Sequence, residues 1–354
     1  MESYFESVGA VHLHSDFSDG ALPIPEIARI AAEVNLDFLM FTDHNTLEPK
    51  RRGFEGWYGR TLVLIGCELN DPDDRNHYLA FRIRREIPKG LKAADYVRLV
   101  RRQRGFGVIA HPSEKRNFSD AYPPYPWTDW EARGFDGIEI WNQMSEWLEG
   151  VTRKNIAWRI LHPLRSIRYP MWTTLNRWDT LNRKRRVVGV GGIDVHAFKH
   201  RFLGIFPVEI YPYKVQFKSI RMHLLTRVPL KKDGDVLEFR KAEEAVFEAL
   251  QSGRAFIVNH SLGDGRGFRF HAECGKRRYP PGSRFSRNGA VRFHSEAPLP
   301  GRIRLIHDGK IVREVRGRSL SHETGSPGVY RIEIFRKNRG WIYTNPIVLT
   351  ERKS

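Results

Sequence analysis

The chain has 354 residues, 59 of them Lys or Arg and 41 Asp or Glu, and its formal net charge is +18. At about 150 residues per domain this length favours two domains, and a hydrophobic content of 40% is typical of a globular protein with a sizeable core. No stretch approaches the roughly 20 apolar residues of a membrane span, and the first residues lack a secretory signal pattern. Two cysteines, Cys67 and Cys274, exclude a disulfide framework. We therefore expect a cytoplasmic protein without a membrane partner.

The positive charge is unevenly placed along the chain. Residues 1–212 contain 30 Lys and Arg against 27 Asp and Glu, whereas residues 213–354 contain 29 against 14. Such an excess is typical of a solvated basic face, a nucleic-acid contact or a surface for acidic ligands. Few aromatic residues accompany the basic ones in residues 253–354, although a stacking platform for bases would need them. We expect this segment to bind nucleic acid only weakly, without sequence preference and at low salt.

Short apolar runs alternate with helix-like segments through the first two thirds of the chain. The helix-like segments are residues 26–35, 93–104 and 147–161, and Pro25 precedes the first of them, as is common at a helix start. The expected strands are residues 8–13, 38–42, 62–67, 107–110, 137–141, 187–193 and 202–211. This alternation predicts an α/β fold with a mainly parallel sheet or barrel.

The pattern changes after a further helix expected at residues 239–251. Ser252-Gly253 interrupts the chain, and only short strands and turns follow from Arg254 onward. Asp308-Gly309 lies between two apolar runs, which is a strong hairpin signal. We therefore predict a domain of residues 1–252 and a small all-β, sandwich-like domain of residues 253–354.

Histidines and carboxylates follow one expected strand after another. His12 and His14 lie at the end of the first strand, where alternate residues point to the same side. A single histidine at a strand end is more often a structural residue than a ligand. Here, however, six of the 14 histidines recur with three carboxylates at the edge where α/β enzymes keep their sites. The candidate metal ligands are His12, His14, Asp19, His44, Glu68, His77, His111, Asp194 and His196.

This donor set has a definite metal preference. Imidazole and carboxylate without thiolate suit Zn²⁺, Mn²⁺ or Fe²⁺. Because one zinc ion takes about four ligands, nine candidates indicate two or three divalent ions that share a bridging carboxylate. Closely spaced ions generate hydroxide near neutral pH and stabilise charge on a phosphoryl oxygen. The spacing therefore predicts a metallohydrolase but leaves its substrate open.

At these residues the sequence resembles the polymerase and histidinol phosphatase (PHP) superfamily. The resemblance covers roughly residues 8–211. A weaker likeness, to the carbaryl-hydrolase-like (CehA/McbA) branch, lies in residues 341–347. The matching motifs, in the family's order, are His12-x-His14 with Ser18-Asp19-Gly20, Thr42-Asp43-His44, Gly66-Cys67-Glu68, His111-Pro112 and Asp194-x-His196.

The resemblance implies a distorted (β/α)7 barrel with a trinuclear metal centre at its C-terminal face. By that resemblance, His12, His14, Glu68 and Asp194 hold the first ion. Glu68 bridges to the second ion, which His77 and His111 complete, and Asp19, His44 and His196 hold the third. Family members often have histidine where Asp19 stands, and the spacing at His77 varies within the family. On this basis Glu68, Asp194 and His196 are the expected catalytic residues.

Residues beside the expected ligands are open to two interpretations. Asp43 either orients His44 or caps a loop. Glu139 is expected to pack within the barrel, and Cys67 to be a small buried residue. Five side chains are candidates for substrate binding, although solvated loop charge is the simpler interpretation of the charged ones: Lys115, Arg116, Asn142, Lys199 and His200.

Together these features predict a metal-dependent phosphoesterase that hydrolyses a small phosphate mono- or diester with a metal-bridged hydroxide. Two alternatives remain open from the sequence. One is a metallohydrolase of carbamates, esters or amides, because the same nucleophile attacks a carbonyl group. The other is a nucleic-acid-binding protein whose metal site is structural; the complete ligand set argues against it.

Overall fold

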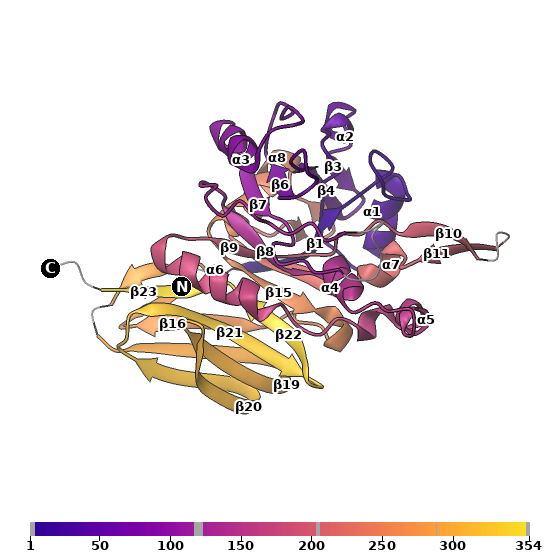
Figure 1. Ribbon diagram of the computed structural model, residues 1–354. Coiled ribbons are helices and arrows are strands. Elements are labelled where there is room, and N and C mark those ends of the chain that lie inside the picture. The colour runs from indigo at the N-terminus through magenta and orange to yellow at the C-terminus, as the bar shows by residue number, and fades with distance from the viewer. Residues whose placement is uncertain (1–3, 117–122, 203–205, 288, 352–354) are drawn as a thin grey trace.

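The computed structural model describes residues 4–116, 123–202, 206–287 and 289–351, without the side chains of residues 198–210. Within these ranges every α-helix precedes residue 252, and the chain beyond it is built of strands (Figure 1). None of the described helices combines the length and the apolar character that crossing a membrane requires. We call residues 4–251 the barrel half and residues 255–350 the β-rich half.

The helices and strands have the following bounds. The helices are α1 (Ile24–Glu33), α2 (Glu48–Arg51), α3 (Ala93–Arg102), α4 (Gln143–Glu149), α5 (Ile156–Leu161), α6 (Trp172–Lys184), α7 (Tyr213–Gln216) and α8 (Phe239–Gln251), with 3-10 turns η1 (Pro163–Arg165) and η2 (His260–Leu262). The strands of the barrel half are β1 (Phe5–Leu13), β2 (Phe38–Phe41), β3 (Gly56–Tyr58), β4 (Thr61–Ile65), β5 (Cys67–Leu69), β6 (Tyr78–Phe81), β7 (Phe106–Ile109), β8 (Gly137–Asn142), β9 (Val188–Gly192), β10 (Phe198–Phe202), β11 (Phe206–Ile210), β12 (Ile220–Thr226), β13 (Lys231–Lys232) and β14 (Asp235–Val236). Those of the β-rich half are β15 (Ala255–Asn259), β16 (Arg269–Cys274), β17 (Arg277–Tyr279), β18 (Arg284–Ser286), β19 (Val291–His307), β20 (Lys310–Thr324), β21 (Gly328–Arg336), β22 (Arg339–Thr344) and β23 (Ile347–Thr350).

Two sheets enclose the core of the barrel half. Strands β1, β2 and β4 pair in parallel in one sheet, and β7, β8 and β9 pair in parallel in the other. The sheets meet at one edge where β4 leads into β5, and at the other where Leu13 bridges Val195. Backbone hydrogen bonds from Ile193 to Val11 and from Asp194 to His12 reinforce the second contact. The carboxyl ends of the parallel strands therefore converge on one rim.

The parallel barrel expected from the sequence is realised only in part. Strand β6 runs antiparallel to both β5 and β7, and β12 lies antiparallel beside β1. Residues 202–211, expected to form a barrel strand, instead include β11, which forms a separate hairpin with β10. The expected strand is therefore present as β11, but its place in a parallel sheet was wrong. Strand β12, which is buried along nearly its whole length, takes the position next to β1.

Two helical regions also differ from expectation. The helix expected at residues 147–161 is divided into α4 and α5, because α4 ends at Gly150 and a turn follows. For helix α6 the sequence indicated only an exposed helix end at the basic residues 183–186, and the rest of the helix was not predicted. Helix α8 has the bounds that the sequence indicated.

The β-rich half continues the sheet of the barrel half. Strand β15 pairs with β12 on one side and with β22 on the other, so hydrogen bonds run unbroken across the chain position where a domain boundary was expected. The predicted hairpin at Asp308-Gly309 is confirmed: it joins the long strands β19 and β20, and both turn residues have positive φ, as a two-residue turn requires. A second apolar cluster fills this half, with Phe293 and Trp341 at its centre.

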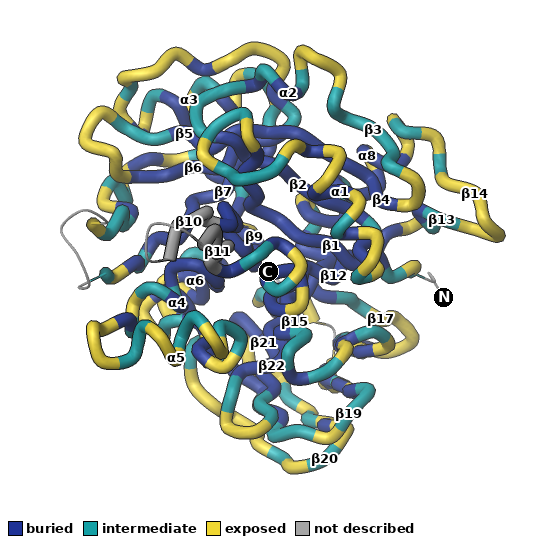
Figure 2. Tube along the Cα trace, turned by 90° about the vertical axis from the view of Figure 1, so that its right-hand side faces the viewer, coloured by how far each residue is buried: buried dark blue, intermediate teal, exposed yellow. Residues whose placement is uncertain are grey.

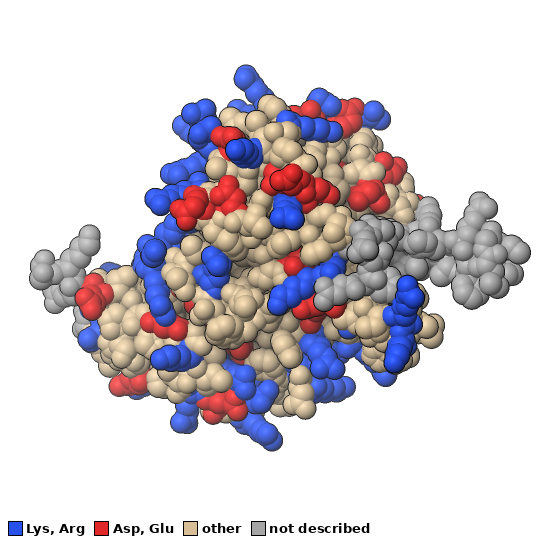
Figure 3. Space-filling model, in the orientation of Figure 1, with Lys and Arg blue, Asp and Glu red and all other residues tan. Residues whose placement is uncertain are grey.

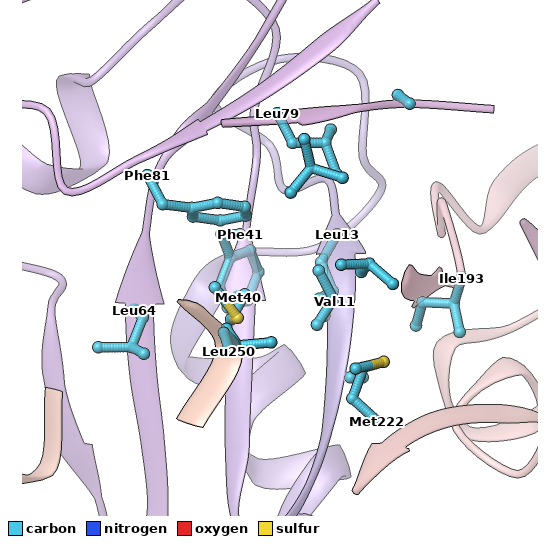
Figure 4. Packing of buried hydrophobic residues seen from close by; sticks show 14 of the residues in the cluster. Val11, Leu13, Met40, Phe41, Leu64, Leu79, Phe81, Ile193, Met222 and Leu250 are labelled. Carbon is cyan, nitrogen blue, oxygen red and sulfur yellow. The ribbon is translucent and has the colours of Figure 1, made fainter. Parts of the chain in front are cut away.

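The core of the barrel half is formed by side chains from strands that are distant in sequence. In Figure 4, Val11 of β1 lies between Met40 of β2 and Met222 of β12, and all three are buried. Figure 2 shows the same strands as a buried centre under partly exposed helices and loops. Each Å² of buried apolar area stabilises the folded state by about 25 cal/mol, so this packing gives the rim above it a stable base.

A buried ion pair joins the barrel half to the β-rich half. The Arg331 guanidinium of β21 donates to both carboxylate oxygens of Asp179 in α6, at 2.8 and 2.9 Å, and also to Glu333. Arg331 and Asp179 are 3% and 1% exposed. Removing one member of such a pair leaves an uncompensated buried charge.

We expect Asp179→Ala to lower the free energy of unfolding by about 3 kcal/mol, since Arg331 keeps Glu333 as a partner. Denaturant titration of the full chain measures this loss. Glu323→Ala removes the exposed pair with Arg292 and should cost less than about 1 kcal/mol. Equal losses in the two variants would contradict a special role for the buried pair.

Candidate metal centre

The nine predicted ligands converge at one rim of the barrel half. His12 and His14 lie at the end of β1, and the other parallel strands β2, β7 and β9 end just before His44, His111 and the pair Asp194 and His196. His77 comes just before β6, and because β6 runs in the opposite direction its first residue lies at the same rim. Strand β5 contributes Glu68. The structure thus brings together all nine residues that the sequence singled out.

Four buried side chains form the first group of donors. Nε2 of His12 lies 2.9 Å from Oε2 of Glu68 and 3.4 Å from Oδ1 of Asp194. Nε2 of His14 lies 3.2 and 3.4 Å from the same two oxygens. One donor atom from each residue lies within 4.8 Å of all the others, a spacing that one metal ion can bridge.

The second carboxylate oxygen of Glu68 faces a different pair of histidines. Oε1 lies 2.8 Å from Nδ1 of His77 and 3.3 Å from Nε2 of His111. Glu68 is 1% exposed; Oε1 meets two imidazole nitrogens, and Oε2 meets those of His12 and His14 and, at 3.7 Å, Nδ1 of His44. A carboxylate in this position can bridge two cations.

The third group lies nearer the surface. Oδ2 of Asp19 is 3.2 Å from Nε2 of His196 and 3.7 Å from Nε2 of His44. Nδ1 of His14 is 3.5 Å from the other oxygen of Asp19, so His14 joins this group as well. The Asp19 side chain is 51% exposed, and the centre is therefore open to solvent on this side.

Local backbone geometry turns several ligands into the centre. His12, His111 and Asp194 all have positive φ, which is uncommon for residues other than glycine. The pairing of β1 with β2 shifts register at His12, as in a β-bulge, and bulges re-aim side chains beside active sites. Gly20 completes the turn that carries Asp19, since a Cβ there would lie 2.4 Å from the carbonyl oxygen of His14.

The imidazoles and carboxylates of the centre shift one another's pKa values. Burial alone would lower the pKa of the His14 imidazole, but the carboxylates of Asp194 and Glu68 raise it to about 10. His77 behaves alike, because Glu68 and Asp74 outweigh its burial and raise its pKa to about 10. Burial would raise the pKa of Glu68, yet the surrounding histidines hold it well below the usual range. Without a metal ion, protons shared with the histidines neutralise these carboxylates.

The donor set fits divalent metal ions. Among the described residues, both ring nitrogens of His14, Nε2 of His77 and Nδ1 of His111 are buried without a well-formed hydrogen bond. Burial lowers the pKa of His44 to about 4, so this ring is neutral at pH 7 and presents a lone pair. Buried nitrogens without a well-formed hydrogen bond, next to carboxylates that attract cations, are what Zn²⁺, Mn²⁺ or Fe²⁺ would bind.

Glu139 takes part in the centre, although the sequence interpretation assigned it to barrel packing. Its Oε1 lies 2.9 Å from Nδ1 of His12, and its Oε2 accepts from the backbone N–H of His111 at 2.7 Å. A Cβ at Gly192 would lie 1.7 Å from Oε1, so only glycine leaves room for this carboxylate. Glu139 orients two ligands, and the expectation of a packing role was wrong.

We expect Glu139→Gln to weaken metal binding by about 10- to 100-fold, the usual effect of losing a partner that orients a ligand. Metal titration followed by calorimetry measures the change. Glu273→Gln removes a carboxylate 3.3 Å from His271, outside the centre, and should leave the affinity unchanged. Unaltered affinity in Glu139→Gln would contradict the orienting role.

Asp43 does not contact His44 in a hydrogen bond. Its carboxylate accepts from the backbone N–H and the hydroxyl of Ser15 and from the hydroxyl of Ser18. Of the two interpretations, the loop cap is the one that these contacts support. Cys67 is buried, as expected.

The five substrate-binding candidates have different surroundings. Asn142 donates to Glu139 at 2.9 Å and to Asp194 at 3.3 Å, so it braces the centre. Arg116 donates to Glu114 and lies over the ring of Tyr125, and Lys115 is exposed. The side chains of Lys199 and His200 lie outside the described residues.

A cleft of about 320 Å³ borders the centre at His111, Glu139 and Asn142. Its outer walls come from α4, from α5, which supplies Arg159, and from the loop between α5 and α6, which supplies Arg168. Glu114, Glu146, Glu149, Trp141 and Tyr169 also line it. Burial raises the pKa of Glu146 to about 7. No sequence pattern marked these residues as part of a site, because they belong to no motif.

No protein-family model matches the chain, and a search of curated proteins finds no match. Solved structures similar to it include a two-domain Bacteroides vulgatus protein containing a predicted PHP-like metal-dependent phosphoesterase, with 15% identity over 97% of this chain and 96% of that one and a TM-score of 0.46. A Bifidobacterium adolescentis protein predicted to be a metal-dependent phosphoesterase has 17% identity, covering 53% and 87% of the two chains, with a TM-score of 0.32.

An amidohydrolase from Chromobacterium violaceum, solved with bound sulfate, is also similar. Its identity is 14%, the match covers 58% of this chain and 92% of that one, and the TM-score is 0.31. At identities this low, the chemistry of the centre has to be inferred from its own residues.

Proposed function

We propose that the chain is a metal-dependent hydrolase that cleaves phosphate esters. The observation that carries the proposal is the position of Glu68, whose two carboxylate oxygens face two separate pairs of histidine nitrogens. A buried carboxylate shared between two imidazole pairs is suited to hold two cations at close distance. The phosphoesterase descriptions of two similar structures agree with this proposal.

The number and positions of the metal ions follow from the same donor groups. Three ions would use the three groups described above, with Glu68 shared by the first two and His14 close to the first and the third. Divalent ions bound there would activate water near neutral pH and offset charge that develops on a phosphoryl oxygen. Zn²⁺, Mn²⁺ and Fe²⁺ all suit these ligands.

The protein's own side chains prepare the centre for this chemistry. Glu139 fixes the ring of His12, and Asn142 ties Glu139 to Asp194. Asp19, half-exposed at the open side, leaves a route for the substrate and for water. Arg159 and Arg168 in the adjoining cleft provide positive charge that a phosphate group would meet.

Hydrolysis of a carboxylic or carbamic ester is a second candidate. The same cleft contains four glutamates and two aromatic side chains, Trp141 and Tyr169. Acidic and aromatic walls suit a neutral aryl ester better than a doubly charged phosphate monoester. The amidohydrolase among the similar structures is in line with this alternative.

Turnover of matched aryl substrates separates the two functions. Metal-loaded protein is assayed with 4-nitrophenyl phosphate, bis(4-nitrophenyl) phosphate and 4-nitrophenyl acetate, each also after chelation. We expect chelator-sensitive release of nitrophenol from one or both phosphate esters. Chelator-sensitive turnover of the acetate alone would support the second candidate and contradict the first.

A further inference from the structure

A second cleft, of about 730 Å³, lies between the barrel half and the β-rich half. It shares no lining residue with the cleft beside the metal centre. Its walls come from η1, from the turn before β12 together with β12 itself, from η2, and from the β21–β22 turn. The cleft is thus built from four segments that are far apart in the sequence.

Five cationic side chains line this cleft, and among the described residues no Asp or Glu does. They are Arg165, Lys218, Arg221, Lys337 and Arg339. Within the described ranges, none of the five forms an ion pair with a carboxylate. By contrast, the nearby Arg266 pairs with Asp264 at 3.1 Å. Carboxylates outside the cleft, Asp264 for Arg221 and Glu146 for Arg339, offset part of this charge, but no described carboxylate lines the cleft itself.

Two of the five cations are held firmly in place. Arg221 is 5% exposed, and its guanidinium donates only to carbonyl oxygens, those of Phe217 at 2.7 Å and Val34 at 3.2 Å. Arg339 donates to the carbonyl oxygen of Ile167 at 2.7 Å and to that of Leu164. Burying a guanidinium without a counter-charge is costly, so an anion in the cleft would relieve an existing penalty.

The other three cations have long, flexible side chains and lie at the rim of the cleft. Lys218, Lys337 and Arg165 are exposed, and the positive φ of Lys337 and Asn338 forms the tight turn that presents Lys337. His260 also lines the cleft, but burial and the neighbouring His223, whose Nε2 is 2.7 Å away, lower the pKa of its ring, so it adds no charge at pH 7. The cleft therefore combines two fixed arginines, Arg221 and Arg339, with three exposed, flexible cations that can adapt to an anion.

We propose that this cleft binds a compact polyanion that carries two or more phosphate groups. The concave shape and the convergence of five cations from four segments suit a small ligand. Among the described residues no Phe, Tyr or Trp lines the cleft, so it lacks the stacking surface that bases usually need. On the face drawn in Figure 3, Lys and Arg are spread over both halves and interrupted by acidic and uncharged residues, unlike a continuous track for nucleic acid.

Calorimetric titration with inorganic tripolyphosphate tests the proposal. The full chain is titrated after chelation, so that the probe does not compete for metal ions, and again with metal bound. We expect one saturable site in both states. The double variant Lys218→Ala with Lys337→Ala should weaken it at least tenfold, whereas the control Lys276→Ala with Lys310→Ala, which removes two exposed lysines of the β-rich half elsewhere, should not.

Three results would overturn the proposal. The first is the absence of saturable binding to the unaltered protein. The second is an equal loss in the two double variants, which would show that the probe senses only the overall charge. The third is tight binding of a mixed-sequence DNA duplex near 0.15 M salt that the Lys218 and Lys337 variant abolishes, which would assign the cleft to nucleic acid instead.

Discussion

Glu68→Gln should lower the metal-dependent turnover by about a thousandfold and leave the fold intact. Loss of a single positioned electrostatic group in an active site already costs about 10²–10³ in kcat. Glu68 carries the one charge that faces both histidine pairs, so its loss should weaken two neighbouring cation sites at once. Glutamine keeps the shape of the side chain. The core below the rim is apolar, so its packing does not depend on the charge of Glu68.

The kinetic measurement is paired with circular dichroism and with a matched control. Glu6→Gln removes a carboxylate that lies 2.6 Å from a buried histidine, His223, away from the centre. This control should retain turnover. Near-normal turnover in Glu68→Gln, with a normal spectrum, would show that Glu68 does not bridge.

Metal loading should raise the melting temperature markedly, and chelation should lower it. A ligand at 100 times its Kd stabilises the folded state by about 2.7 kcal/mol for each site. In a chain of this size that corresponds to a rise on the order of 5 °C per occupied site. Differential scanning calorimetry with Mn²⁺ or Zn²⁺, with and without chelator, measures the effect. A melting temperature that does not respond to either metal would contradict a built centre.

The pH dependence of this stabilisation has a definite sign. In the metal-free centre the pKa values of His14 and His77 are raised to about 10, so both rings hold protons at pH 6 to 8. Metal binding must displace these protons, and the metal affinity therefore rises with pH across this range. We expect the metal-induced rise in melting temperature to be larger at pH 8 than at pH 6.

The convergence of the nine candidate ligands could be predicted from the sequence because their positions are set by local rules. Histidine or carboxylate residues just after short apolar runs lie at the ends of strands, and parallel strands place those ends at one rim. His77 obeys the same rule in reverse, since β6 is antiparallel and its first residue lies at that rim. A candidate ligand reaches this rim either after a parallel strand or before an antiparallel one. The direction of the strand decides which, and the sequence does not show that direction.

Glu139 was misassigned because strict alternation fails at that point. The pairing of β8 with β9 shifts register between Glu139 and Trp141, so inward and outward positions could not be counted from the ends of the strand. Gly192 offered a signal, since a glycine opposite a buried carboxylate provides the room that it needs. Its significance becomes clear only when the partner strand is known.

Most of helix α6 was missed because its buried face is largely polar. Thr174, Asp179 and Asn182 are buried along with Leu175 and Trp178, so the apolar period is weak. Those polar groups are satisfied by distant parts of the chain, as in the contact of Asp179 with Arg331. The linings of the two clefts escaped prediction for a similar reason: loops and turns from separate segments build them, and no spacing along the sequence records their proximity.

The metal content of the purified protein tests the central claim most directly. Protein prepared without chelator, and again after incubation with excess Mn²⁺ or Zn²⁺, is analysed by elemental mass spectrometry against protein concentration. Eight of the nine candidate donors fall into three overlapping groups, and His111 lies 3.3 Å from Glu68, so we predict between two and three equivalents of divalent transition metal. At most one equivalent, even after incubation with excess metal, would contradict a multinuclear centre.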